Sequence, residues 1–173
     1  MNESKETPST LAGLVRAAGM PPLERPFLRE TVLAGLGGFL AIAVLAGLGA
    51  IAAAPLIIAP FGASSVLLFS LPASPLAKPR NVIGGHIISA LVGLLALSIL
   101  GASPLSMAAG VGAAIVAMRL TGTTHPPAGA NPIVVIAAGA PWWFVAVPVA
   151  AGAATLVISA TLYHRWVSGH AYP

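Results

Sequence analysis

The sequence predicts an all-α integral membrane protein with about six transmembrane segments, on the basis of its composition and its long apolar runs. Of the 173 residues, 57% are hydrophobic and 7% are charged, and the mean hydropathy is +0.94. In a soluble domain about a quarter of the residues are charged. From Thr31 to Tyr163 apolar runs follow one another, and about 20 such residues in a helix cross the ~30 Å hydrocarbon layer. A soluble helical protein would need a polar exterior that this chain cannot supply.

Six membrane segments can be placed in these runs. They cover residues 31–50, 51–71, 82–101, 104–120, 121–140 and 143–163. The second and the fifth contain internal prolines, which remove a backbone donor and clash with the preceding helical turn. We therefore expect these two segments to be broken or re-entrant, and a count of four or five crossings is the alternative.

The rest of the chain is predicted to form two tails around one transmembrane domain. Residues 1–30 are mixed polar and lack the basic-then-apolar layout of a signal peptide. We expect them to form a cytoplasmic tail with a short interfacial helix at Leu11–Ala18. Residues 31–164 form the transmembrane domain and residues 165–173 a second cytoplasmic tail. The chain contains no cysteine, which excludes disulfides and cysteine-ligated metals.

The charges predict an orientation and a class of solute. All acidic residues precede Thr31. The basic residues beyond that point are Lys78, Arg80, Arg119 and Arg165. With both termini in the cytoplasm, all four lie on the cytoplasmic side, as the positive-inside rule requires, and Trp142 and Trp143 lie at the outer interface. A cation pathway normally needs carboxylates, so their absence favours an anion or a neutral solute.

The two proline-containing segments resemble each other. The stretch "PFGASSVLL" at 60–68 aligns with "PAGANPIVV" at 127–135, an offset of 67 (127 minus 60). The same offset carries the first and third segments close to the fourth and sixth. We therefore predict two inverted repeats of three segments each, roughly 31–97 and 98–164, a construction common among transporters.

An inverted repeat brings the two broken segments together near the membrane centre. Irregular backbone is tolerated there only where it is packed in protein or lines a polar cavity. Each restarting helix exposes N–H groups and a positive dipole end, so two facing restarts form an anion site without fixed charge. We expect Ser64, Ser65 and Asn131 to cap these restarts. The expected substrate-binding residues are Gly62, Ala63, Ser64, Ser65, Thr124, His125, Gly129, Ala130 and Asn131.

Histidines and arginines add to this predicted site. His125 directly precedes the second restart, where it can donate a hydrogen bond and, when protonated, supply positive charge. We expect Arg80, His86 and Arg119 to act in the pathway or in gating. The alternatives are that the histidines are structural hydrogen-bonding residues and that the arginines are interfacial charges. His164 and His170 are expected to be interfacial only.

Three stretches carry a resemblance to a known family. "APFGASSVLLF" at 59–69, "SPLAKPRNVIGGH" at 74–86 and "THPPAGANP" at 124–132 resemble the HPP family, small membrane proteins named for the His-Pro-Pro triplet. The resemblance covers about 55–165 and implies nitrite transport, as for characterised members in cyanobacteria and chloroplasts. Its signature positions here are His125, Pro126 and Pro127, with Pro79, Arg80, Asn81 and His86 in the second stretch.

These observations predict a transporter or channel for a small inorganic anion, nitrite or nitrate first, in a bacterial cytoplasmic membrane. A homo-oligomer is expected, because the many small residues favour close helix contacts in the bilayer. The alternatives are a pore for a neutral solute, such as the protonated acid, and a non-transporting scaffold subunit. An enzyme is not expected, because the chain has no Asp and histidines without a carboxylate make a poor metal site. No cofactor and no nucleic acid are expected as partners.

Overall fold

The computed structural model describes residues 13–14, 18–19 and 25–172, and the elements assigned within them are helical. The α-helices are α2 (Arg25–Ala52), α3 (Ala59–Ser70), α4 (Pro79–Leu100), α5 (Pro104–Leu120), α6 (Asn131–Ala137) and α7 (Ala151–Tyr163). Short 3₁₀ or π turns are η1 (Pro75–Ala77), η2 (Pro126–Ala130), η3 (Trp142–Val145), η4 (Ala146–Ala150) and η5 (His164–Ser168). The predicted N-terminal tail and its helix at Leu11–Ala18 lie largely outside the described residues.

Three of the described helical stretches are long and apolar enough to cross a membrane. They are Pro26–Ala52, Pro79–Leu100 and Trp142–Ser168, the last joining η3, η4, α7 and η5. Pro60–Ser70 and Pro104–Leu120 are shorter apolar helices. The first helix begins at Arg25 rather than at residue 31, since Pro26 is compatible with a first helical turn. The sequence-based prediction of an all-helical membrane protein is confirmed.

The second and fifth predicted segments are not continuous helices. Residues 53–58 are non-helical, and α3 then begins with Pro60 in its first turn. In the second half of the chain, η2 leads into α6, which is 7 residues long and has Pro132 in its first turn. Proline therefore begins helices here, where its missing N–H costs nothing. The two-fold relation between the halves remains a prediction.

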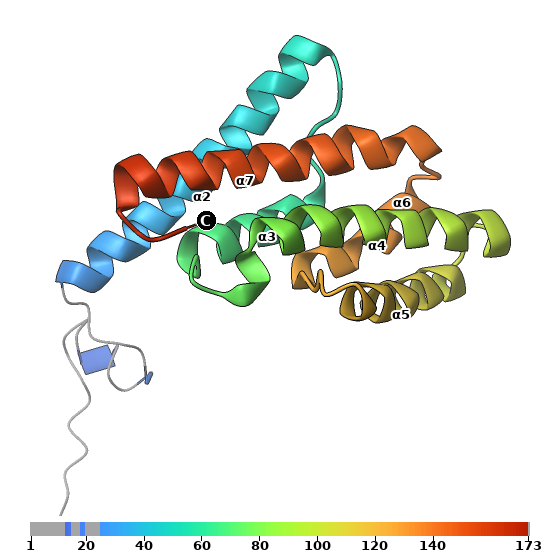
Figure 1. The fold of residues 1–173 in the computed structure, drawn as a ribbon, viewed down its shortest axis with the longest axis horizontal. Helices are drawn as coiled ribbons and strands as arrows, with labels where there is room; N and C mark the ends of the chain where they lie inside the picture. The colour runs from blue at the N-terminus through green and yellow to red at the C-terminus, as the bar shows by residue number, and fades with distance from the viewer. Residues whose placement is uncertain (1–12, 15–17, 20–24, 173) are drawn as a thin grey trace, which may run out of the picture.

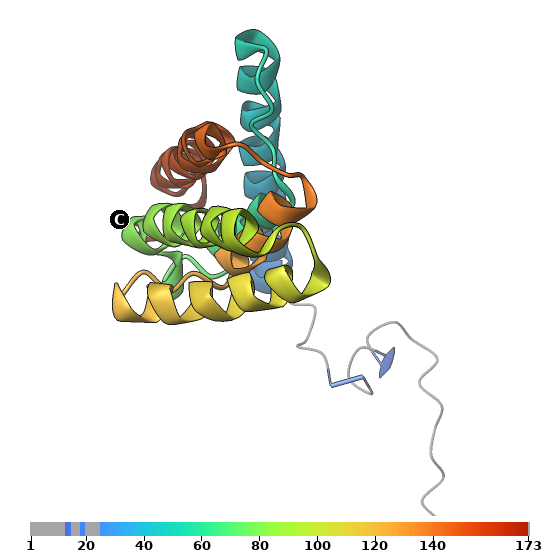
Figure 2. The same ribbon diagram turned by 90° about the vertical axis from the view of Figure 1, so that its right-hand side faces the viewer.

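The helices form one bundle around α4, which packs against α5, α6 and α7. In Figure 1, α4, α5 and α7 run along the long axis of the molecule, and α2 crosses it at an angle. The short helices α3 and α6 fill the space between the long ones, α3 against α2 and α7, and α6 against α4 and α5. The C-terminal half of α2 projects away from the body in both views (Figures 1 and 2).

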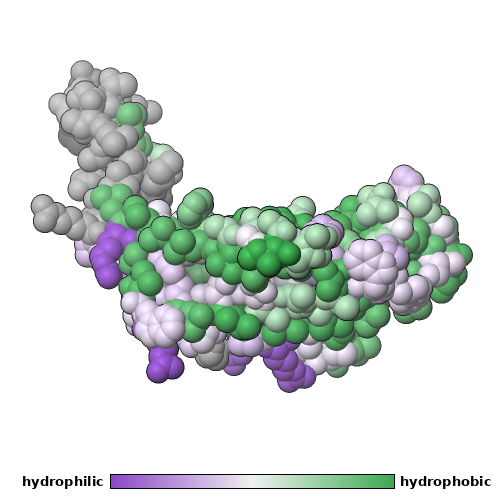
Figure 3. Space-filling model, turned by 90° about the horizontal axis from the view of Figure 1, so that it is seen from above, coloured by the Kyte–Doolittle hydropathy of each residue, from purple (hydrophilic) through white to green (hydrophobic). Residues whose placement is uncertain are grey.

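The outside of the bundle is as apolar as its core. Fully buried side chains include Phe61, Leu68 and Leu156. On α2, however, Phe39 is 68% exposed and Ile51 is 86% exposed. Figure 3 shows that hydrophobic residues dominate this face of the body and that strongly hydrophilic ones are few. Such a surface is suited to contact with lipid rather than water.

The basic residues gather at one end of the bundle. Nη2 of Arg80 donates to the Thr121 carbonyl at 2.8 Å, and the Tyr172 hydroxyl donates to the Ala77 carbonyl at 2.9 Å. Burial raises the pKa of Tyr172 to about 12, so this hydroxyl keeps its proton at neutral pH. These bonds draw the loop before α4, the loop after α5 and the C-terminal segment together (Figure 1). The segment beginning at Trp142 lies at the opposite end.

Candidate functional site

Four buried polar side chains from distant parts of the sequence form one cluster, here called the histidine network. Ser64 comes from α3, His86 from α4, His125 from the turn before η2, and Asn131 from the start of α6. Three of them are 0% exposed and Asn131 is 1% exposed. All four were predicted site residues, and the fold brings them together.

Ser64 is the centre of the histidine network. Its Oγ lies 2.9 Å from Nε2 of His86, 2.9 Å from Nε2 of His125 and 3.2 Å from the Pro60 carbonyl oxygen. On the far side of His125, Nδ1 lies 2.9 Å from the Leu76 carbonyl oxygen. Both ring nitrogens of His125 and Nε2 of His86 therefore have polar neighbours.

Asn131 completes the network beside His86. Its Nδ2 lies 3.0 Å from Nδ1 of His86 and donates to the His86 carbonyl at 2.9 Å. The amide oxygen lies further from the same Nδ1, at 3.3 Å. The amide therefore binds both the ring and the backbone of His86 and fixes how the imidazole is turned.

These partners determine where the protons sit in the neutral state. A carbonyl only accepts, so Nδ1 of His125 carries the proton and its Nε2 accepts one from Ser64. Ser64 then accepts from Nε2–H of His86, whose unprotonated Nδ1 accepts from the Asn131 amide. The chain of donors runs in one direction from Asn131 to Leu76. Among the described residues no buried side-chain nitrogen or oxygen lacks a partner.

Side chains of α4 also hold the broken segment in place. Ser89 donates to the Ala128 carbonyl, and Asn81 donates to the Thr124 carbonyl at 2.8 Å. Thr124 precedes η2, so its carbonyl has no helical partner and accepts from α4 instead. The Ala128 carbonyl lies in η2 and accepts from Ser89 in addition to the backbone N–H of Asn131. Gly85 allows this approach, because a Cβ at that position would lie 2.7 Å from the Thr123 oxygen and 2.8 Å from Cβ of His125.

The histidine network is buried between the basic end and the middle of the bundle. His86 lies seven residues into α4, about 10 Å from its start, whereas the whole 22-residue helix rises about 33 Å. The network thus lies about a third of the way along α4. The expected position of the site near mid-membrane remains a prediction. Phe61 closes one side, with its ring centroid 5.1 Å from that of His86 at an interplanar angle of 78°.

The predicted helix caps are wrong. Pro60 begins α3 early, and the cap position is Ile58, so Ser64 and Ser65 lie in the second turn. The Ser65 hydroxyl donates to the Phe61 carbonyl at 2.9 Å and does not join the network. Asn131 is the first residue of α6 and makes no cap bond. The functional groups gathered here are therefore side chains rather than free N–H groups at helix ends.

Several predicted site residues lie outside the histidine network. Gly62 and Ala63 are exposed on the opposite face of α3, and Gly129 and Ala130 are half-buried in η2. Thr124 contributes its carbonyl, which accepts from Asn81. Among the predicted pathway residues, His86 is inside the network. Arg80 and Arg119 are exposed at the basic end, Arg80 holding the Thr121 carbonyl.

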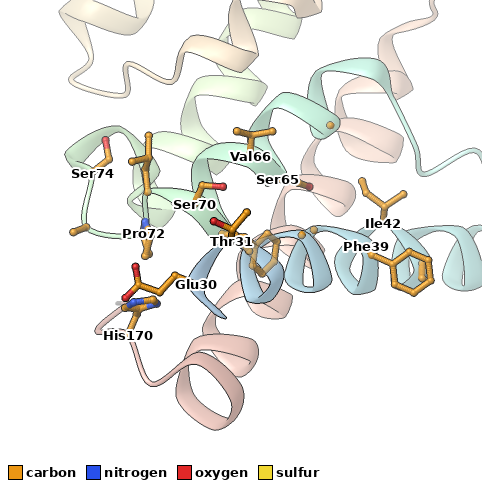
Figure 4. Close-up of a pocket in the computed structure, with 18 of the residues that line it drawn as sticks. Glu30, Thr31, Phe39, Ile42, Ser65, Val66, Ser70, Pro72, Ser74 and His170 are labelled. Atoms are coloured by element: carbon orange, nitrogen blue, oxygen red, sulfur yellow. The ribbon is translucent and has the colours of Figure 1, made fainter. Parts of the chain in front are cut away.

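Gly62 and Ser65 line a separate groove between α2 and α3. It has a volume of about 1270 Å³, and its walls are mainly apolar. Figure 4 shows Phe39 and Ile42 on α2 along one side, Ser65, Val66 and Ser70 on α3 along the other, and Glu30 with His170 at one end. The buried network lies on the far side of α3 from this groove, because Ser64 and Gly62 point in different directions.

Sequence reasoning missed some partners of the network. The carbonyls of Pro60 and Leu76 are backbone groups that every residue has, so the sequence does not indicate that they bind the network. Sequence reasoning also assigned no role to Ser89, which donates to the Ala128 carbonyl; its spacing of one helical turn from His86 is the signal that could have indicated one. His164 was expected to be interfacial but is 1% exposed, since Nε2 lies 2.9 Å from the Leu68 carbonyl oxygen and Nδ1 lies 2.7 Å from the Ser168 hydroxyl. Among the described residues no group of three or more His, Asp or Glu could hold a metal.

Long apolar helices with an apolar exterior and a buried polar network define an integral membrane protein. The chain belongs to the family described as "HPP, transmembrane region", which matches residues 23–173. The resemblance seen in the three sequence stretches is thereby confirmed. No solved structure matches the chain.

Two curated relatives, both from Dictyostelium discoideum, are similar to this chain. Transmembrane protein DDB_G0269096 is 34% identical over 88% of this chain and 57% of its own length. Transmembrane protein DDB_G0273707/DDB_G0273361 is 38% identical over 65% of this chain and 39% of its own length. The chain therefore spans about two fifths to three fifths of these relatives. Their names state a membrane location and no activity.

Proposed function

We propose that this protein is a transporter or channel for a small inorganic anion, with nitrite or nitrate as the first candidates. The observation that carries the proposal is the histidine network itself. It places four hydrogen-bonding side chains inside an apolar bundle, in a chain with no Asp or Glu after Glu30. A buried anion needs several donors to offset its lost hydration, and no carboxylate is present there to repel it.

The basic end of the bundle supports an anion on electrostatic grounds. Arg80 and Arg119 are exposed there, close to the loop that carries His125. Exposed positive charges raise the local concentration of anions at an entrance. The network is closed by its own hydrogen bonds, so transport requires that an anion replace some of them. The proposed route runs from the basic end past Thr124 to His125 and Ser64.

The test is anion flux into liposomes that contain the purified protein. Nitrate uptake is followed in stopped flow, with nitrite as a second substrate. His125→Ala should reduce flux at least tenfold, since it removes the bond to Ser64, while the protein remains folded by circular dichroism and gel filtration. His164→Ala is the matched control, because the His164 side chain is also inaccessible to solvent but is bonded elsewhere. Absence of flux in wild type would contradict the proposal and favour a scaffold subunit, whereas uptake of neutral solutes alone would favour a neutral pore.

We also propose that the protein is a homo-oligomer, in a cytoplasmic membrane with both termini inside. The connection at residues 53–58 is non-helical, and Ala53, Pro55 and Ile57 on it are exposed. This connection leads to the start of α3. Five helical residues separate that start from Ser64, so the start lies about 8 Å further from the basic end and well inside the bilayer. Irregular backbone at such depth needs cover from protein or enclosed water. A second copy packed on the projecting half of α2 would supply that cover.

A further inference from the structure

The histidine network has two complete hydrogen-bonding arrangements that differ by one proton. The Ser64 hydroxyl has two acceptors within reach, Nε2 of His125 at 2.9 Å and the Pro60 carbonyl oxygen at 3.2 Å. In the neutral arrangement its proton is directed mainly to the nearer one, Nε2 of His125. If Nε2 of His125 is protonated, the hydroxyl can turn to the Pro60 carbonyl. Its oxygen then accepts from Nε2–H of both histidines, which its two lone pairs allow. Nδ1–H of His125 keeps its bond to Leu76 throughout.

Protonation therefore breaks no hydrogen bond without replacing it. The added proton forms an N–H bond at Nε2 of His125, and the Ser64 hydroxyl changes acceptors. His86 is less suited to the second proton, because Asn131 presents its amide nitrogen to Nδ1 at 3.0 Å, closer than the amide oxygen at 3.3 Å. A hydroxyl with two acceptors thus distinguishes this cluster from an ordinary structural histidine pair.

A buried imidazolium also needs a compensating negative charge, because burial of an unpaired charge is strongly unfavourable. The elements around His125 supply none. Among the described residues packed here, α3, η1, η2 and α6 carry no titratable side chain, and α4 contributes His86 and the outlying Arg80. The nearby end of α5 adds Arg119, and the junction of η1 and α4 adds the exposed Lys78, both of which are positive. A monovalent anion from outside is therefore the counter-charge that this site can accept.

We infer that the histidine network binds one proton together with each anion, with the proton on His125, the Ser64 hydroxyl turned to Pro60, and the anion replacing Ser64 as an acceptor of Nε2–H. The inference rests on the proposed anion function and adds the coupling ion. The pair of imidazolium and anion is neutral overall, so it can be buried without net charge. Transport would then be electroneutral and driven by a proton gradient rather than by membrane potential.

The first test measures binding without transport. Purified protein in weakly buffered detergent solution is mixed with sodium nitrate, or separately sodium nitrite, and a pH dye reports proton uptake after subtraction of a protein-free blank. We expect close to one proton per chain at saturation. Ser64→Ala should lose most of this uptake and His125→Gln all of it. Ser98→Ala is the matched control, because its hydroxyl also donates to the carbonyl four residues earlier. Equal uptake in wild type and His125→Gln, or none in wild type, overturns the inference.

The second test measures the driving force in liposomes. An inward proton gradient should drive nitrate accumulation, and a valinomycin–potassium potential at equal pH should not. Nitrate is used because its acid is strong, which prevents leakage of neutral acid through the lipid. Flux driven by potential alone overturns the inference and leaves the transport function standing. Proton uptake in detergent without any flux in liposomes has the opposite meaning: the coupling of proton and anion stands, and the transport function fails.

Discussion

Nε2 of His125 lies 2.9 Å from Oγ of Ser64, although 61 positions separate the two residues in the sequence. This contact joins Ser64, in the stretch "PFGASSVLL", to the residue two positions before the stretch "PAGANPIVV" that the sequence pairs with it. It connects α3 to the chain before η2.

Asn131 should stabilise the fold through His86. Asn131→Ala leaves the buried Nδ1 of His86 without its donor and removes the second donor to the His86 carbonyl, and an unsatisfied buried group costs about 1–3 kcal/mol. We expect unfolding in mixed micelles at correspondingly lower denaturant. Thr155→Ala is the control, because Thr155 bonds to the Ala151 carbonyl of its own helix. Equal stability of the two variants would show that the amide contributes nothing.

Gly93 should be essential for the packing of α4 on α6. A Cβ at Gly93 would lie 2.7 Å from Cα of Pro132, and backbone atoms cannot move aside cheaply. Gly93→Ala should therefore destabilise the protein by about 1–3 kcal/mol, as overpacking does. Gly112→Ala, with nothing within 4 Å of the added atom, should be neutral or stabilising. Thermal unfolding of both variants in detergent tests this prediction. An unchanged unfolding temperature for Gly93→Ala would contradict the packing of α4 on α6.

Arg119 should attract anions without holding the structure. It is exposed at the end of α5. Arg119→Gln should reduce nitrate flux several-fold at an ionic strength of about 0.01 M and little at about 0.5 M, since the attraction of an exposed charge is screened by salt. Flux is measured in liposomes at both salt concentrations. A loss independent of salt would instead indicate direct contact with the solute.

The basic end should face the cytoplasm. The chain has no cysteine, so single cysteines can be introduced without further changes. Ala73→Cys, in the exposed loop before α4, should react with a membrane-impermeant maleimide only after permeabilisation of the cells. Ala102→Cys, exposed between α4 and α5, should react in intact cells. The reverse pattern would contradict the orientation that the basic residues predict.

The projecting end of α2 should lie against a second copy. Ile51, at that end, is 86% exposed in a single chain. Ile51→Cys is therefore expected to give crosslinked dimers with a short thiol reagent in native membranes. Leu105→Cys, 76% exposed on α5, is the comparison and should crosslink less. Mass measurement in mild detergent complements this test, and monomers throughout would contradict the proposed oligomer.

Composition and the long apolar runs were sufficient to predict the class of protein and where most of its helices lie. The apolar runs predicted the long helices, because a helix of about 20 apolar residues is stable across the bilayer in any sequence context. The prolines predicted where helices are interrupted, since proline affects the backbone locally. The His-Pro-Pro stretch and its two companions indicated the family. The same stretches contained His125, Ser64, Asn131 and His86, which the fold then joins.

Only the tertiary structure decided how these residues act. A sequence shows that Ser64 follows a proline, but not that Pro60 begins α3 early enough to place Ser64 in the second turn, between two imidazoles. It also cannot show that the Leu76 carbonyl meets Nδ1 of His125 and so fixes its proton. Hydrogen bonds to backbone atoms depend on where distant segments are placed, and no residue type records that placement. For the same reason the sequence led us to expect His164 at the membrane interface only, although its side chain is buried in the fold.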